Sequence, residues 1–216
     1  MNRICQIIIV GCLPLILCAP AGAQHVGPYA GAFVGGSSLA DARGSDDKGD
    51  VRLTFDPGFA GSAVLGWDFE AGNPVGEGRV ELEYTRRSNP LKKVEFVEGS
   101  RAGGGSVTAD SLLLNAFGVF HDSGRWAPYV GGGLGAARVE ATDMKASGQP
   151  FVSGSAIVFA YQLGIGVDVA LTEHLNLDLG YRFFGSIAPN FTEVGGRKLA
   201  VDYFSHNVVL GLRVGF

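Results

Sequence analysis

An apolar residue at every second position is the feature that most restricts how this sequence can fold. The longest example runs from Ile157 to Leu171, where Ile, Phe, Tyr, Leu and Val occupy the odd positions and mostly small or polar residues the even ones. A period of two is typical of a β-strand with one apolar and one polar face. The same alternation recurs at Leu175–Phe183, Gly78–Arg87 and Asn207–Phe216. The sequence therefore predicts a protein built from strands.

Four less regular segments, Tyr29–Leu39, Phe59–Phe69, Leu112–Phe120 and Tyr129–Val139, complete a set of eight strands. The connections between them are expected to alternate in length, beginning and ending with a long one. An up-and-down membrane barrel with large outer loops and tight periplasmic turns gives this order. We therefore predict an all-β protein, an eight-stranded antiparallel up-and-down transmembrane β-barrel. The predicted connections are Ala40–Gly58, Ala71–Gly78, Asn89–Ser111, His121–Arg125, Glu140–Ser155, Thr172–His174 and Gly185–Tyr203.

Aromatic residues fall at the two ends of the strands once the chain is threaded in this way. Rings that are apolar but carry a polar group favour the boundary between water and lipid. A soluble barrel gives no reason for this sorting. The periplasmic rim is expected to hold Tyr29, Trp67, Phe69, Phe120, Trp126, Tyr129 and Phe216, and the opposite rim Phe59, Tyr84, Phe159, Tyr181 and Phe183.

The first 23 residues are typical of a secretory signal peptide. Arg3 precedes a short apolar run, and Ala21 and Ala23 form a small-residue cleavage site before Gln24. This run is shorter than the roughly 18 to 20 apolar residues that a membrane-spanning helix needs. All three cysteines lie in this segment, so residues 24–216, the predicted barrel domain, contain no cysteine. We predict export to the cell outer membrane with removal of the signal peptide.

The chain resembles the opacity and surface-antigen family of small outer-membrane barrels, also described as a porin family and related to the OmpA-type transmembrane domain. The resemblance rests on "YAGAFVGGS", "APYVGGGLGAARV", "FAYQLGIGVDVALTEHLNLDLGYRF" and "HNVVLGLRVGF". The last of these is similar to the terminal strand that the β-barrel assembly machinery reads, in which a final aromatic residue is characteristic. The resemblance thus implies an assembly signal formed by Leu210, Leu212, Val214 and Phe216.

The glycines of "YVGGGLGAARV" also match the spacing of a dinucleotide-binding loop at Gly131, Gly133 and Ala136. Such a loop needs an acidic residue about 20 residues further on to bind the ribose. The sequence has no acidic residue between Asp143 and Asp168, and the protein is predicted to be exported. We interpret the glycines instead as positions where a strand curves and leaves room for bulky side chains across the lumen.

The polar faces of the strands are expected to fill the barrel lumen. An eight-stranded barrel is just wide enough for its own side chains, and charges confined there must be paired. We predict a salt-bridged plug, with a narrow ion path lined by the same residues as the alternative. The facing of Arg138 and its strand is left open. The predicted lumen charges are Asp68, Glu81, Glu83, Asp168, Asp178, Arg182 and Arg213.

No cofactor, metal ion or catalytic group is predicted. Ser205 and His206 are adjacent in a strand and so point to opposite faces, which disfavours a nucleophile–base pair. The formal net charge of −4 argues against nucleic acid as a partner. Charged residues concentrate in the predicted outer loops, where we expect them either to be solvated and bind lipopolysaccharide or to form a surface for host or cell contact. These include Asp46, Asp47, Lys48, Asp50, Arg86, Arg87, Lys92, Lys93, Arg197 and Lys198.

The predicted function is therefore that of an integral outer-membrane protein with a structural, surface-antigen or adhesin-like role. A narrow porin for ions or small solutes is the first alternative, and a lipid-modifying enzyme of the outer membrane the second. The expected partners are outer-membrane lipids, lipopolysaccharide, the assembly machinery and a host or cell-surface ligand.

Overall fold

The computed structural model describes residues 26–46, 49–69, 77–120, 125–187, 190–193, 198–200 and 203–216. The signal peptide, with Ala21, Ala23 and Gln24, lies outside these residues. The described part of the chain has no helix long and apolar enough to cross a bilayer. Its strands are β1 (Gly27–Leu39), β2 (Ala42–Asp46), β3 (Gly49–Phe55), β4 (Gly58–Phe69), β5 (Gly78–Phe96), β6 (Gly99–Val119), β7 (Trp126–Ala146), β8 (Gln149–Ala170), β9 (Leu175–Ser186), β10 (Asn190–Glu193), β11 (Lys198–Ala200) and β12 (Tyr203–Gly215).

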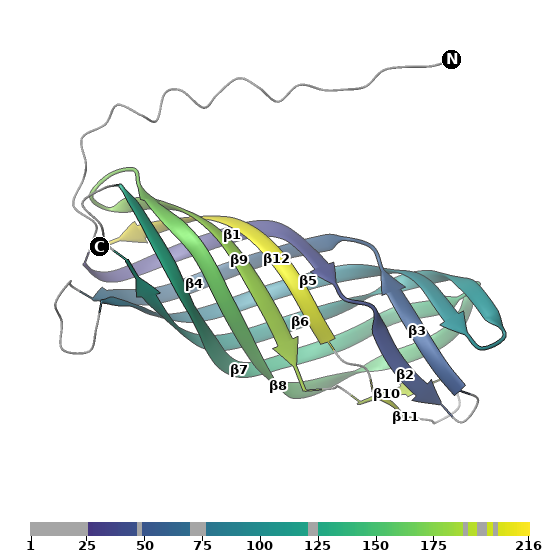
Figure 1. The fold of residues 1–216 in the computed structure, drawn as a ribbon. Helices are drawn as coiled ribbons and strands as arrows, with labels where there is room; N and C mark the ends of the chain where they lie inside the picture. The colour runs from purple at the N-terminus through teal and green to yellow at the C-terminus, as the bar shows by residue number, and fades with distance from the viewer. Residues whose placement is uncertain are drawn as a thin grey trace, which may run out of the picture.

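Eight of these strands form a closed antiparallel ring in the order β1-β4-β5-β6-β7-β8-β9-β12 (Figure 1). The ring closes between the first and last strands, from Tyr29 opposite Gly215 to Leu39 opposite Ser205. Closure gives every ring strand two hydrogen-bonded neighbours and so leaves no open sheet edge. The predicted eight-stranded up-and-down barrel is confirmed.

The barrel is apolar on its outside, the reverse of a soluble barrel. Each ring strand exposes a large aliphatic side chain on its outward face, while the charged residues on the alternate positions point inward. A continuous exposed apolar surface of this kind is costly in water and is expected in contact with lipid. The eight side chains, from β1 to β12, are Val34, Leu65, Leu82, Leu114, Leu134, Leu163, Leu179 and Leu210.

The two ends of the barrel differ in their connections. β8 and β9 are joined by the short turn 171–174 at one end, here called the short-turn end. At the other end, the long-hairpin end, β5 to β8 continue past the neighbouring ring strands (Figure 1). The segments expected as loops at Asn89–Ser111 and Glu140–Ser155 are strands for most of their length, so that part of the prediction was wrong. The two hairpins turn at Val97–Glu98 and at Ser147–Gly148.

The extension of β5 to β8 is stabilised by a hydrophobic core that continues into the ring as far as Leu113 and Phe184. β3 pairs with β5 and β2 with β3, while β10 pairs with β8 and β11 with β10, so the short strands widen the sheet on both sides. Buried apolar residues from β3, β5, β6 and β7 meet inside it, among them Leu53, Val94, Val107, Val139 and Met144. Burial of these side chains explains why strands persist beyond the ring.

The aromatic residues follow the predicted belts with two exceptions. Trp67, Phe120, Trp126 and Phe216 are exposed at the short-turn end, and Phe59, Tyr84, Phe159 and Tyr181 at the other. Tyr29 and Tyr129, which were predicted to be exposed at the periplasmic rim, are buried, so their assignment to that aromatic belt was wrong. Both occupy inward positions of their strands, where their hydroxyl groups form hydrogen bonds with charged side chains.

The last strand presents its outward residues as expected. Leu210, Leu212 and Val214 are exposed on one face of β12, while Arg213 points inward, and Phe216 directly after the strand is also exposed. The four residues of the predicted assembly signal therefore form one apolar stripe that ends at the short-turn end.

Candidate functional site: the barrel lumen

Arg79 is the centre of a buried ion-pair network at the short-turn half of the lumen. Its Nε atom lies 2.8 Å from Glu81, and its Nη2 atom lies 3.2 Å from Asp178. Its Nη1 atom pairs with Asp168. None of these four side chains has surface within reach of water. Buried charges are tolerated only when paired, and this guanidinium serves three carboxylates at once.

A second arginine approaches the same carboxylates from β12. Arg213 lies 3.1 Å from Asp68 through Nη1 and 2.7 Å from Asp168 through Nη2. Its Nε atom is 3.8 Å from Asp178. Asp168 and Asp178 face each other across β8 and β9, so the two acids are held together between two guanidinium groups.

Two of the buried tyrosines, Tyr29 and Tyr129, complete this layer. Tyr29 donates a hydrogen bond to Glu81 at 2.7 Å, and Tyr129 donates one to Asp178 at 2.7 Å. Tyr129 also accepts a hydrogen bond of 2.9 Å from Arg182. Glu81 and Asp178 thus each accept a hydrogen bond from one tyrosine hydroxyl group in addition to their arginine partner.

A second polar layer lies further toward the long-hairpin end. Glu83 accepts hydrogen bonds from Thr85 at 2.6 Å, Asn115 at 2.7 Å and Gln162 at 3.0 Å. Arg87 donates to the side-chain oxygen of Gln162 at 3.0 Å. The amide of Gln162 thus connects a buried carboxylate to a buried guanidinium without a direct ion pair.

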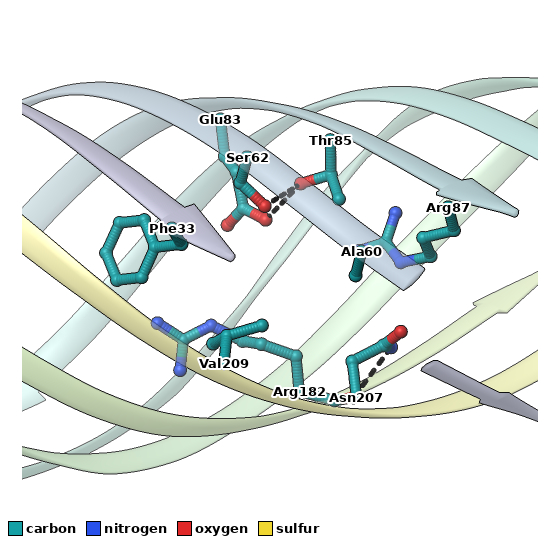
Figure 2. A pocket seen from close by; sticks show the side chains of 9 residues that line it. All are labelled: Phe33, Ala60, Ser62, Glu83, Thr85, Arg87, Arg182, Asn207 and Val209. Carbon is teal, nitrogen blue, oxygen red and sulfur yellow. Dashed lines mark hydrogen bonds between the residues drawn. The ribbon is translucent and has the colours of Figure 1, made fainter. Parts of the chain in front are cut away.

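A small cavity lies between this layer and the opposite wall. Figure 2 shows Glu83, Ser62 and Thr85 on one side and Val209 and Asn207 on the other. Its volume is about 10 Å³, which is close to the space that one water molecule needs. The lumen at this height is therefore nearly filled by side chains.

The predicted lumen charges all lie inside the barrel and are buried: Asp68, Glu81, Glu83, Asp168, Asp178, Arg182 and Arg213. Sequence reasoning missed Arg79, although it shares the inward parity of Glu81 and Glu83 on the same strand. Arg86 and Arg87 were assigned to an outer loop, and this was wrong, because both lie within β5. Arg87 is buried beside Phe184, with its guanidinium 4.1 Å from the ring centre. Arg138 faces outward and lies 3.3 Å from Glu140.

The glycines of β7 make room for neighbouring side chains. A Cβ atom on Gly131 would approach the ring of Phe117, and one on Gly133 would collide with the side chain of Asn115. Both neighbours lie on the adjacent strand β6, so the expectation of partners across the lumen was wrong in that detail. Tyr129 is accommodated in the same way, because its hydroxyl group lies where Gly166 would carry a Cβ atom.

The residues considered for catalysis are not brought together. Ser205 and Asn207 are buried on the inward face, whereas His206 is exposed on the outward face, as their positions in one strand predicted. His206 contacts Tyr181 through Nδ1 at 2.6 Å. Within the described ranges, no group of three or more His, Cys, Asp or Glu side chains could hold a metal ion.

Comparison with known proteins places this geometry among membrane barrels. Residues 10–216 match the family described as "Outer membrane protein beta-barrel domain". The chain is similar in structure to Neisserial surface protein A, with a TM-score of 0.54 and 20% identity over 88% of this chain and 97% of that one. OprG from Pseudomonas aeruginosa gives a TM-score of 0.51 and 18% identity over 91% of this chain and 99% of that one. No curated protein matches the chain. At these identities, the two structures establish a shared fold.

Proposed function

This chain belongs to the outer membrane protein β-barrel domain family, and we propose that it acts as a closed scaffold that displays a folded structure on the cell surface. Its place in the outer membrane follows from the family and the fold. Its role is structural, antigenic or adhesin-like. The observation that carries the proposal is the sealed lumen, because Arg79, Asp168 and Asp178 have no surface that water can reach.

The long-hairpin end supplies the displayed structure. In outer-membrane barrels short turns face the periplasm and longer connections face the outside. The extension of β5 to β8, widened by β2, β3, β10 and β11, then projects from the cell as one sheet with a hydrophobic core. A rigid surface of this kind suits contact with a host or cell-surface ligand and with lipopolysaccharide.

A narrow porin is the second candidate, and the cavity beside Glu83 and Arg87 is the observation that favours it. A cavity with room for about one water molecule is too small to form a path unless the network opens. The opposite faces of Ser205 and His206 argue against the lipid-modifying enzyme that stood as the other alternative. We propose no catalytic role.

Electrical recording in planar bilayers tests the closed scaffold. The folded protein is expected to insert without conductance steps above the baseline, because paired side chains fill the lumen. A known porin in the same bilayers serves as the positive control. Reproducible steps from the unaltered protein would favour the porin instead.

Epitope insertion tests the display. A tag placed at Ser147–Gly148, a two-residue turn in which both residues have positive φ, is expected to bind antibody on intact cells. The matched tag at Thr172–His174 is expected to bind only after the outer membrane is permeabilised. The reverse pattern would invert the orientation of the barrel.

The C-terminal stripe of Leu210, Leu212, Val214 and Phe216 is proposed as the signal read by the assembly machinery. Phe216 is 70% exposed, so its deletion removes few contacts within the barrel. We expect the deletion to lower the amount of protein in the outer membrane while detergent refolding, followed by heat-modifiable gel mobility, stays nearly normal. Equal losses in both measurements would make Phe216 a packing residue only.

A further inference from the structure

The outward face of β6, β7 and β8 carries an open apolar groove. Ala116 and Gly132 lie opposite each other on β6 and β7 and form its floor, because glycine has no side chain and alanine has only a methyl group. Leu114, Leu134 and Leu163 line its sides. The groove has a volume of about 810 Å³ and lies in the band of exposed aliphatic residues that faces lipid.

A row of charged residues crosses the same outward face toward the long-hairpin end. Arg86 on β5 lies opposite Asp110 on β6, and Asp110 lies opposite Arg138 on β7. An arginine on the lipid side costs about 2 to 4 kcal/mol at the bilayer midplane and about 0 to 1 kcal/mol near the interfaces. The row therefore marks one boundary of the hydrocarbon region, which is the extracellular one in the orientation proposed above.

The groove and the row are separated by the depth of one leaflet. Arg138 follows Gly132 by six positions on β7, which is about 20 Å along the strand. A strand tilt of about 35–45° reduces this separation to roughly 15 Å along the membrane normal. Half of a hydrocarbon core that is about 30 Å thick is also about 15 Å. A lipid with its headgroup at the row would reach the groove floor with an acyl chain.

The two arginines keep hydrogen-bond donors free for a headgroup. Their side chains are 63% exposed at Arg86 and 56% exposed at Arg138. Arg86 contacts Asp110 through Nη1 at 3.2 Å, and Arg138 contacts Glu140 through Nη2 at 3.3 Å. Because a guanidinium has five N–H donors, each carboxylate can orient an arginine and leave other donors outward. Guanidinium groups pair well with phosphate oxygens.

We propose that this face binds a phosphorylated lipid of the extracellular leaflet, with an acyl chain in the groove and a phosphate at Arg86 and Arg138. Only a ligand that is both anionic and acylated uses the two parts together. The proposal rests on the orientation given under the proposed function, but because the site lies outside the barrel it does not depend on whether the lumen conducts or on what the extension contacts.

Binding of lipid A to the purified barrel tests the proposal. The protein is placed in phosphatidylcholine nanodiscs with a small fraction of bisphosphorylated lipid A, and retained lipid is counted by native mass spectrometry. The unaltered protein is expected to retain lipid A in preference to its dephosphorylated form. The double variant R86Q/R138Q is expected to lose about tenfold or more in retention, because two charge-assisted hydrogen-bonding groups are removed.

Two further variants separate the parts of the site. Ala116→Leu fills the groove and is expected to lower lipid A retention several-fold while both arginines stay in place. The control R52Q/K92Q removes two exposed cations of the extension and is expected to retain lipid A like the unaltered protein. Equal retention by R86Q/R138Q and the control would overturn the proposal. So would equal retention of lipid A and dephosphorylated lipid A by the unaltered protein, a comparison that needs no variant to fold.

Discussion

Arg79→Gln is expected to destabilise the folded barrel by about 3 to 5 kcal/mol, the range seen when one partner of a buried ion-pair network is removed. Arg79 contacts Glu81, Asp168 and Asp178, and none of these side chains can turn toward water. Its guanidinium also lies 4.2 Å from the ring centre of Tyr129. Glutamine can donate to one of the carboxylates but supplies no charge to any of them. Urea unfolding in lipid vesicles, followed by heat-modifiable gel mobility, measures the loss.

Asp178→Asn is the matched control, because it also changes a fully buried member of the network. The buried charged residues in the described part of the lumen are five acids and four arginines, a formal balance of −1. Removing one acid brings this balance to zero and leaves an amide that can still contact Arg79 and Tyr129. We expect a change of about 1 kcal/mol or less, the size of one rearranged hydrogen bond.

The difference between the two variants is the informative result. If Arg79→Gln and Asp178→Asn lower the free energy of unfolding equally, packing rather than charge pairing holds the lumen together. If Arg79→Gln has no effect, water or ions reach the network, and the porin becomes the better reading of the lumen.

The ring could be predicted because its strands obey one simple rule. Between Leu175 and Phe183 the facing of each residue is fixed by parity once one face is known to meet lipid. The same rule would have placed Arg79 and Tyr129 inside. Both were missed because they lie near strand ends. There the local pattern is equally compatible with a side chain exposed at the rim and with one that points into the lumen.

The long-hairpin end was less predictable for a different reason. Asn89–Ser111 and Glu140–Ser155 are rich in glycine, serine and charged residues, a composition typical of loops. Their strands are held by a core that gathers short apolar segments from distant parts of the chain, such as Leu53 and Val107. Local bulges at Gly104–Ser106 and Ala141–Met144 also interrupt the period of two. Burial that depends on tertiary contacts leaves little trace in a local pattern.

The pairing of charges in the lumen could likewise not be predicted from the sequence. Parity identifies which residues point inward, but it cannot tell that Asp168 contacts Arg79, 89 residues away, or that Gln162 joins Glu83 to Arg87. Those contacts depend on the register of every strand between them. A shift of one residue in any pair would exchange the inward and outward faces.

Leu134→Arg is expected to cost about 2 to 4 kcal/mol of stability in lipid, because it places a cation deep on the lipid side of β7. Leu134 is 60% exposed, and its cross-strand neighbours on the same face are Leu114 and Tyr161. The chain already tolerates Arg138 four residues further along the same face, at the boundary where an arginine costs least. The stability cost of an arginine on this face should therefore depend on its position along the strand rather than on its charge alone.

Thr142→Arg is the control for this last comparison, since Thr142 is exposed on the same strand beyond Arg138. We expect it to change the free energy of unfolding by less than about 0.5 kcal/mol, as surface substitutions usually do. Both variants are to be refolded into vesicles and into detergent. A loss for Leu134→Arg that appears in vesicles and shrinks in detergent micelles would locate Leu134 in the hydrocarbon region. The same small effect from both variants in vesicles would mean that this face of β7 does not contact lipid, and the placement of the barrel in the bilayer would have to be redrawn.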